Sequence, residues 1–226
     1  MVKLKKNIKY NNLFETKMLC NYLFIDDKYR IDHSKHIQRI LIEQHHFIKE
    51  NTIDLNEYIK YVDYDIINDK YKCKKQINII NRFYGISKEL FIITQLNKEK
   101  QLNKYLVNNQ NILTGMKIKY NGKLREEISN IDYLDLVQKH QYHSVNNSSG
   151  INVYSFSLYP DDLQPSGVSN FSKIGELELE LEINWKLILS LNTSERIIRV
   201  AIYNTFYNFL NFIGGQAGLL YTNIDL

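Results

Sequence analysis

The clearest pattern along the chain is a strict alternation of apolar and polar residues in GELELELEINW, residues 175–185. A period of two puts the apolar side chains on one face of a strand, whereas a helix would scatter them around its axis. We therefore predict a strand with a buried leucine face. The opposite face carries four glutamates, Glu176, Glu178, Glu180 and Glu182. We interpret them as a solvent-facing row compensated by lysine or arginine on neighbouring strands. The alternative is an acidic stripe for a basic partner or a metal.

Other apolar-rich runs predict further strands. They are Leu13–Ile25, Ile37–Phe47, Tyr71–Ile80, Lys88–Gln95, Ile112–Tyr120, Lys123–Ile128, Ile131–Val137 and Arg196–Ile213. Asn121-Gly122, between two of these runs, is the strongest short signal for a two-residue hairpin turn. Gly214-Gly215 ends the last long strand, and Ala217–Thr222 closes the chain.

The segments between these strands are polar or carry helix signals. One short helix is expected over Lys28–Ile37, because the two aspartates before it can cap its first turn. Residues 49–70 predict a long loop or a weak hairpin, and 97–111 and 140–150 predict loops. About eight to ten strands without a β–α–β repeat predict an all-β protein. We expect an antiparallel β-sandwich, a jelly roll, with one short helix.

Both prolines of the chain lie in Ile151–Ile174, which predicts a strand, a rigid corner and a second strand. The first strand should end at Tyr159, because Pro160 has no N–H to donate to a sheet. Pro160-Asp161-Asp162 suits one helical turn, with acidic residues near its positive end. Gln164-Pro165-Ser166-Gly167 is typical of a type I turn.

Length, charge and cysteine content narrow the class of protein. The 226 residues are enough for one ordinary domain. The net charge of +4 is concentrated in a basic arm, residues 1–12, which we interpret as a solvated terminus rather than a specific nucleic-acid contact. Cys20 and Cys73 lack a nearby partner and predict buried thiols in a reducing compartment. The sequence shows neither a signal peptide nor an apolar run of the length that a transmembrane helix needs.

Six histidines are the main candidates for chemistry, and their spacing does not favour a site. His33 and His36 could share a helix face, but no third ligand is evident. The neighbours His45-His46 would point to opposite faces of a strand, and the remaining two, His140 and His143, fall in a predicted loop. Motifs for nucleophilic, phosphate-binding or metal-dependent enzymes are missing. We therefore predict no catalytic, cofactor-binding or metal-binding residues and no enzyme activity.

The corner segment carries a specific resemblance. NVYSFSLYPDDLQPSGVSNFSKI, residues 152–174, resembles the signature of the major capsid proteins of nucleocytoplasmic large DNA viruses, the double jelly-roll family. Further segments resemble family segments in the same order, over roughly residues 13–223. They are Cys20–Phe47, Gly85–Gln95, Tyr133–Ser144 and Ala201–Asn223. Asp27-Lys28-Tyr29-Arg30 stands where the family has an acid–arginine cluster, so that match is weaker.

The resemblance implies a viral structural protein. Family members are usually about twice this length and carry two jelly rolls, and all the matches belong to the second roll. Residues 13–226 are thus expected to form a single jelly-roll domain. A split gene, a short paralogue and a fragment are all compatible with the missing first roll, whose absence should leave an apolar flank that associates with other chains.

By resemblance, the function is to form or contribute to trimeric, pseudo-hexagonal capsomers of an icosahedral virion that is assembled in the host cytoplasm. The expected partners are other capsid chains, either copies in a homotrimer or a chain that supplies the first roll. A transient assembly scaffold of the same family and a carbohydrate-binding jelly-roll module are the alternatives.

Overall fold

Two large antiparallel sheets form the body of the protein, which a computed structural model describes over residues 21, 23–68, 70–98, 104–144 and 149–221. The first sheet has the order β1-β12-β6-β10, with β2 and β13 also paired to β12 and β9 paired to β6. Its strands are β1 Gln38–Phe47, β2 Asn51–Asp54, β6 Ile86–Leu96, β9 Ile151–Ser155, β10 Ser169–Asn170, β12 Ile197–Ile213 and β13 Gln216–Leu219.

The second sheet has the order β5-β11-β7-β8, and a small hairpin of β3 and β4 lies beside it. The strands are β5 Ile77–Asn81, β7 Leu113–Tyr120, β8 Lys123–Ile128, β11 Leu177–Ile183, β3 Val62–Asp65 and β4 Lys70–Cys73. The expected antiparallel sandwich is therefore confirmed. The Asn121-Gly122 hairpin is also confirmed, because both residues have positive φ, 49° and 76°, as a type I′ turn requires.

The core fills the space between the two large sheets. Alternate residues of β11 supply its leucine face, and the facing side comes from alternate residues of β6 and β12. Central members of this core are Leu90, Ile92, Ile118, Leu179, Leu181, Ile198, Val200 and Ile202. Each such side chain contributes about 1.5–3 kcal/mol when it leaves water, so this alternation accounts for the pairing of the two sheets.

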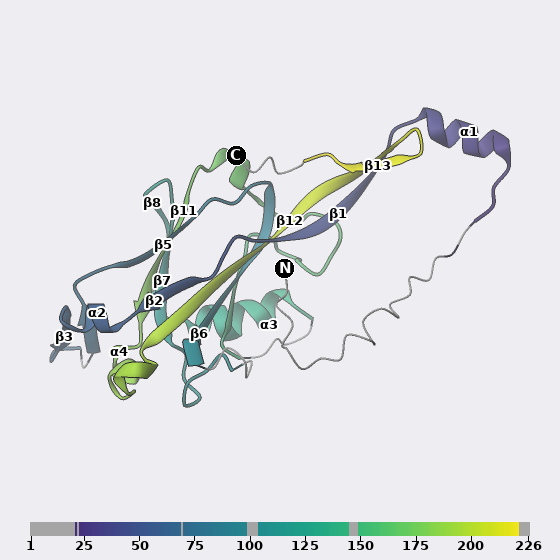
Figure 1. The fold of residues 1–226 in the computed structure, drawn as a ribbon. Helices are drawn as coiled ribbons and strands as arrows, with labels where there is room; N and C mark the ends of the chain where they lie inside the picture. Colours follow the sequence, from purple (N-terminus) through teal and green to yellow (C-terminus); the bar gives the residue numbers. More distant parts are fainter. Residues whose placement is uncertain (1–20, 22, 69, 99–103, 145–148, 222–226) are drawn as a thin grey trace.

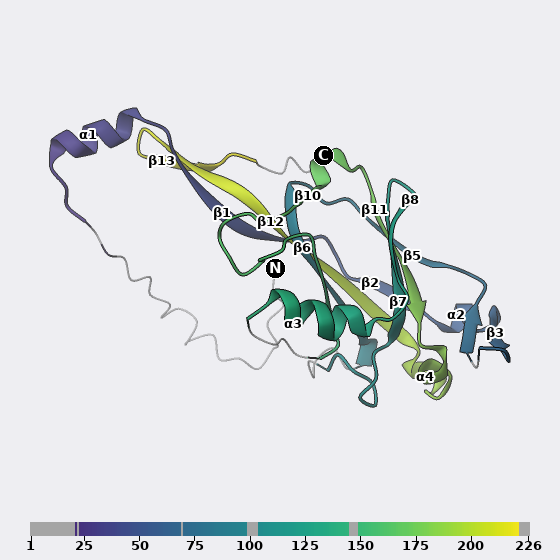
Figure 2. The ribbon, with the colours of Figure 1, turned by 180° about the vertical axis from the view of Figure 1, so that it is seen from behind.

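Part of the first sheet extends beyond the sandwich. Figures 1 and 2 show that β1, β12 and β13 form a ribbon that runs past the second sheet, with α1 (Asp27–Lys35) at its far end. The ribbon is continuous with the body because β12 pairs with β6 over Ile198–Tyr207 and with β13 over Leu210–Ile213. We call the part of this ribbon beyond the second sheet, together with α1, the arm.

The structure contains more helix than the single short one expected. Besides α1, which confirms that prediction within two residues, it has α2 Asn56–Ile59, α3 Gln138–Tyr142 and α4 Trp185–Leu189. The strand predicted at Ile131–Val137 is wrong, because Tyr133–Val137 forms a π-helical turn that continues into α3. This helical unit packs on β9, where the Gln138 side chain accepts a hydrogen bond of 2.8 Å from the Ser155 N–H. None of the helices among the described residues combines the length and apolar character needed to cross a membrane.

Three other predicted segments differ from the structure. The strand expected at Tyr71–Ile80 is two strands, β4 and β5, which belong to different sheets and are separated by a bend at residues 74–75. Residues 49–70 form β2, α2 and β3 rather than one long loop, and the alternative, a weak hairpin, is confirmed in part by the pairing of β3 with β4. The structure does not describe the basic N-terminal residues 1–12, Cys20 or most of the strand predicted at Leu13–Ile25. Residues 23–25 of that predicted strand form no regular element. Cys73 is half-buried and free.

Candidate functional site

Two glutamates of the row on β11, Glu178 and Glu180, are paired with lysines of the neighbouring strand β7, and Glu180 is buried rather than solvent-facing as predicted. The Lys119 Nζ lies 2.7 Å from one carboxylate oxygen of Glu180 and 3.6 Å from Glu178. Lys117 contacts Glu180 at 3.9 Å from the same side. The hydrogen bond with Glu180 raises the pKa of Lys119 above its ordinary value. These pairs support the interpretation as a compensated face. Among the described residues, no cluster of three histidine, cysteine or acidic side chains could hold a metal ion.

The first four histidines occur as one pair at α1 and one pair on β1. His33 and His36 are both exposed on α1, where the His36 ring contacts the Asp32 carbonyl oxygen at 2.9 Å. His45 contacts the Thr205 hydroxyl at 3.1 Å, and His46 packs against the rings of two aromatic residues, Phe83 and Tyr84. The two neighbours on β1 therefore occupy different surroundings, as their sequence positions predict.

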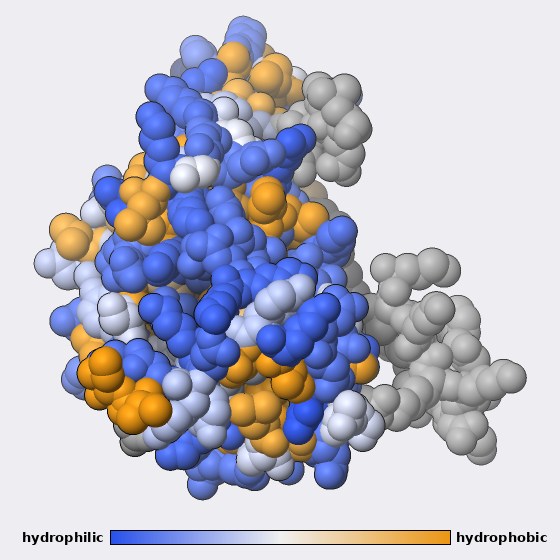
Figure 3. All heavy atoms as spheres, turned by 90° about the vertical axis from the view of Figure 1, so that its left-hand side faces the viewer, coloured by the Kyte–Doolittle hydropathy of each residue, from blue (hydrophilic) through white to orange (hydrophobic). Residues whose placement is uncertain are grey.

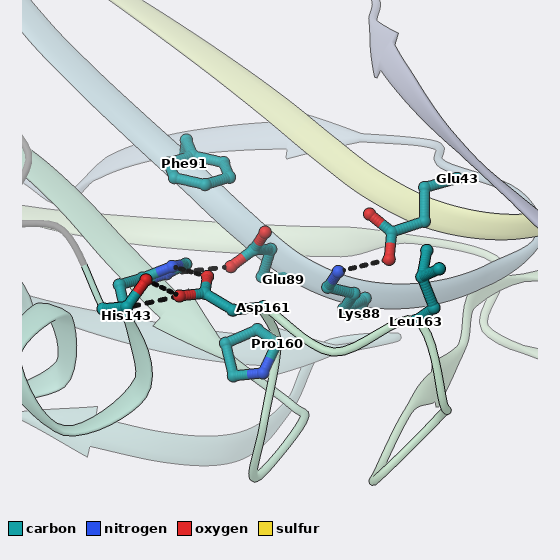
Figure 4. Close-up of a pocket in the computed structure, with 9 residues that line it drawn as sticks. Glu43, Lys88, Glu89, Phe91, His143, Pro160, Asp161 and Leu163 are labelled. Atoms are coloured by element: carbon teal, nitrogen blue, oxygen red, sulfur yellow. Dashed lines mark hydrogen bonds and ion pairs between the residues drawn. The ribbon is translucent and has the colours of Figure 1, made fainter.

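The loop expected around His140 and His143 is partly wrong, because His140 lies in α3 and His143 directly follows it. Figure 4 shows the His143 ring between two carboxylates that come from different parts of the fold. Its Nδ1 lies 2.8 Å from the Asp161 carboxylate in the corner, and its Nε2 lies 3.1 Å from the Glu89 carboxylate on β6. The side chains of His143 and Glu89 are almost completely buried, with 9% and 7% exposed. Sequence reasoning missed this cluster.

A hollow of about 550 Å³ lies beside this cluster, and Figure 4 shows the residues around it. Its lining includes Lys88, whose Nζ lies 2.5 Å from the Glu43 carboxylate of β1, and the exposed Leu163 of the corner. Each carboxylate at this hollow therefore lies against a basic side chain, Lys88 or His143.

The cluster is not arranged as a nucleophilic site. Both ring nitrogens of His143 face carboxylates, and the nearby Ser144 hydroxyl donates to Asp161 at 2.7 Å. A histidine that activates serine must accept its proton, so this geometry favours a charge clamp over catalysis.

The proline-containing corner is fixed by side chains more than by regular structure. β9 ends at Ser155, earlier than the predicted Tyr159, and a hydrogen bond of 3.2 Å from the Asp162 N–H to the Tyr159 carbonyl closes a single turn after it. The Ser166 hydroxyl accepts a 2.8 Å hydrogen bond from the Tyr159 N–H and lies 2.6 Å from the Ser157 hydroxyl. The second strand expected after the corner is only the two-residue β10.

The Asn-Phe-Ser part of the same motif joins the corner to β6. Asn170 accepts a 3.1 Å hydrogen bond from the Ser172 N–H, and the Ser172 hydroxyl accepts one of 2.9 Å from the Gly85 N–H. The Phe171 N–H donates to the Gly85 carbonyl, and its ring is buried. Asn170, Phe171 and Ser172 thus each have a folding role, so this part of the signature marks a structural junction.

Gly167 is the strained point of the corner, and its replacement by alanine should destabilise the fold. Its φ is +150°, and a Cβ there would lie 2.5 Å from the Phe156 carbonyl oxygen. We expect Gly167→Ala to cost about 1–3 kcal/mol in the free energy of unfolding, measured by urea titration. Gly218→Ala is the matched control, because open space surrounds that position. Equal stabilities of the two variants would contradict this explanation.

Apolar side chains are exposed on the arm. Residues paired across β1, β12 and β13 point to the same side, which places Ile40, Leu210 and Leu219 in one row. Ile40 and Leu219 are exposed and Leu210 is half-buried. This row continues the core-facing side of β12 beyond the second sheet. By contrast, Figure 3 shows that the face near α2 and β3 is mostly hydrophilic with separate hydrophobic patches.

Comparison with known proteins agrees with this architecture. The model of a family described as large eukaryotic DNA virus major capsid protein matches residues 27–218. The major capsid protein of Phaeocystis pouchetii virus is 40% identical over 47% of this chain and 20% of its own length. Probable capsid protein 4 of Acanthamoeba polyphaga mimivirus is 24% identical over 91% of this chain and 38% of its own length.

Solved structures show the same fold. A structure of PBCV-1 VP54 fitted into a reconstruction of the virophage Sputnik has a TM-score of 0.66 at 22% identity, over 88% of this chain and 55% of that chain. The Faustovirus major capsid protein has a TM-score of 0.57 at 10% identity, over 82% of this chain and 36% of that one. The fold is thus a jelly roll, and the chain matches a part of each relative, 20% to 38% of the two curated proteins above. Because the family match covers most of its length, the chain belongs to the major capsid protein family of large eukaryotic DNA viruses.

Proposed function

We propose that this chain is a structural component of a virion, contributing one jelly roll, residues 13–226, to the capsid of a large DNA virus. The family match over residues 27–218 carries this proposal, because it spans both sheets of the sandwich. The charge pairs around His143 and on β11 are the kind that stabilise a fold, and we propose no enzyme activity. The capsomers are trimeric and pseudo-hexagonal in this proposal, and assembly takes place in the host cytoplasm.

The partners in this proposal are other capsid chains. The chain matches only part of each relative's length, and in this proposal it packs against other capsid chains, either further copies or a chain that carries the first jelly roll. The exposed apolar row of the arm supports such contacts, because apolar side chains that lie together on a surface are a common feature of protein interfaces. Contacts repeated by symmetry need only modest individual strength to hold a shell together.

Quantitative mass spectrometry of purified virions tests the function. A capsid component should be present at a copy number comparable with that of the other shell proteins. Detection only in immature particles would instead support the scaffold role. Absence from particles at every stage of assembly would overturn the proposal.

Association through the arm gives a separate prediction. Light scattering of the purified chain should show oligomers, and Ile40→Lys with Leu219→Lys should shift the population toward monomer, because two charges would enter the apolar row. Gln216→Lys is the control, since Gln216 is exposed and lies on the opposite face of β13. A wild-type chain that stays monomeric at high concentration would contradict the prediction.

A further inference from the structure

His143 connects three segments that are far apart along the chain. It follows α3, and its ring contacts Glu89 on β6 and Asp161 in the corner. The adjacent Ser144 strengthens the second contact, because its N–H and hydroxyl each donate a 2.7 Å hydrogen bond to the other Asp161 oxygen. The corner is thus tied to the sheet through one imidazole.

A proton on His143 makes both contacts attractive at once, the hydrogen bond with Asp161 and the ion pair with Glu89. A neutral imidazole has a single N–H and one acceptor nitrogen, whereas an imidazolium donates from both nitrogens. With two carboxylates in front of the ring, the neutral form would direct a lone pair at one of them. Glu89 is nearly buried and would then lose the positive charge of His143, which is costly in a poorly solvated site.

The other charged groups around the cluster do not replace this proton. On β6 and β1, Lys88 is paired with Glu43 at 2.5 Å, and its Nζ lies 5.6 Å from the centre of the Tyr207 ring on β12. Burial is the main cause that raises the pKa of Tyr207. The carboxylates of Glu43 and Glu89, and Asp162 of the corner, raise it further. The surroundings are therefore rich in carboxylates, and Lys88 is already engaged.

The pKa values follow from these contacts. The contact with Glu89 raises the pKa of His143 above its usual 6.5, burial opposes the rise, and Asp161 adds to it. Hydrogen bonds from Ser144 lower the pKa of Asp161 to about 2, and His143 contributes. Asp161 is therefore ionised, and able to pair with His143, at any pH above the usual pKa of aspartate. The stabilisation from protonated His143 is fully present below pH 6.5, and it is lost as the pH rises through the raised pKa of His143.

We propose that protonated His143 is a pH-dependent latch that holds the corner, residues 157–167, against β6 and that releases it when the ring loses its proton as the pH rises. Release would change the position of Leu158, Tyr159 and Leu163, the exposed apolar side chains that the corner carries. The inference concerns the fold alone, so it can fail while the proposed capsid role stands, and the reverse also holds.

Nuclear magnetic resonance titration of the full chain between pH 5.5 and 9.5 tests the latch. We expect the midpoint of the His143 ring to lie above 6.5, the ordinary pKa of histidine. The amide signals of Ser144, Asp162 and Leu163 should shift with the same midpoint as the His143 ring. A His143 midpoint at or below 6.5, or corner amides whose shifts do not follow that midpoint, would overturn the proposal.

Two variants separate the latch from a general effect of pH. His143→Gln should keep the corner amides near their alkaline positions at every pH, while His36→Gln should titrate as the wild type does. If His143→Gln loses the dispersed signals of the folded sandwich, Asp161→Asn provides the second test, since it removes one carboxylate and should lower the His143 midpoint. An unchanged midpoint in Asp161→Asn would also count against the latch.

Discussion

Replacement of Phe171 by alanine is expected to lower the free energy of unfolding by about 3–5 kcal/mol, the usual cost of deleting a buried aromatic ring. Phe171 is 2% exposed, and its ring centre lies 5.7 Å from that of Phe156 and 5.9 Å from those of Phe83 and Tyr120. Phe156 directly precedes the corner, Phe83 lies just before β6, and Tyr120 ends β7. The variant therefore removes the contact that joins both sheets to the corner. Urea unfolding followed by circular dichroism measures the change.

Leu163→Ala is the control for this variant, because Leu163 lies in the same segment but is 76% exposed. Surface substitutions of this kind usually change stability by less than about 0.5 kcal/mol. If the two variants lose similar amounts of free energy of unfolding, the aromatic packing of Phe171 does not explain the loss.

Replacement of Lys139 by methionine should also be severe, at about 3–5 kcal/mol, because it leaves a buried carboxylate without its cation. The Lys139 Nζ lies 2.6 Å from the Asp135 carboxylate, and their side chains are 4% and 7% exposed. Among the described residues, Asp135 would keep the hydrogen bonds from the Gly150 N–H, at 2.8 and 3.0 Å. Thermal unfolding and urea titration should both report the loss.

The double variant Asp135→Asn with Lys139→Met tests the electrostatic cause. It removes the unpaired charge but keeps a similar shape, so it should be more stable than Lys139→Met alone. If the double variant is the less stable of the two, packing of the lysine stem, and not the buried charge, accounts for the loss.

The sheets could be predicted because their signals are local. The alternation at 175–185 is visible without knowledge of any partner, and its apolar face is the buried face of β11. The length of β12 was predicted within one residue, since its apolar run has no proline and ends at a glycine pair. The Asn-Gly turn between β7 and β8 depends on only two residues with positive φ.

The segment Ile131–Val137 was misassigned because a short apolar run does not reveal its own period. Its buried residues are Ile131, Leu134 and Asp135, and they are followed by buried Gln138 and Lys139. That spacing of three and four is helical. Counting apolar residues concealed it, because the polar members of the buried face, an aspartate–lysine pair and a glutamine, resemble surface residues in sequence.

The His143 cluster could not be predicted, because it depends on tertiary structure. Its two carboxylates lie 54 and 18 residues away in sequence, and neither distance corresponds to a repeat along a strand or helix. The sequence did mark Asp161 as part of an unusual corner. The surprise is that an acidic residue expected to favour a helical turn instead binds a histidine from another segment.

The length of β12 has a mechanical consequence. Its 17 residues span about 55 Å as one extended strand, and the same strand lies in the core at one end and in the arm at the other. A force on the arm therefore reaches the sandwich directly, without a loop to absorb it. The hydrogen bonds to β1 run along ten residue pairs and would share that load. The arm should behave as a stiff lever. A neighbouring chain that binds its far end, at α1, would therefore fix the orientation of the whole sandwich.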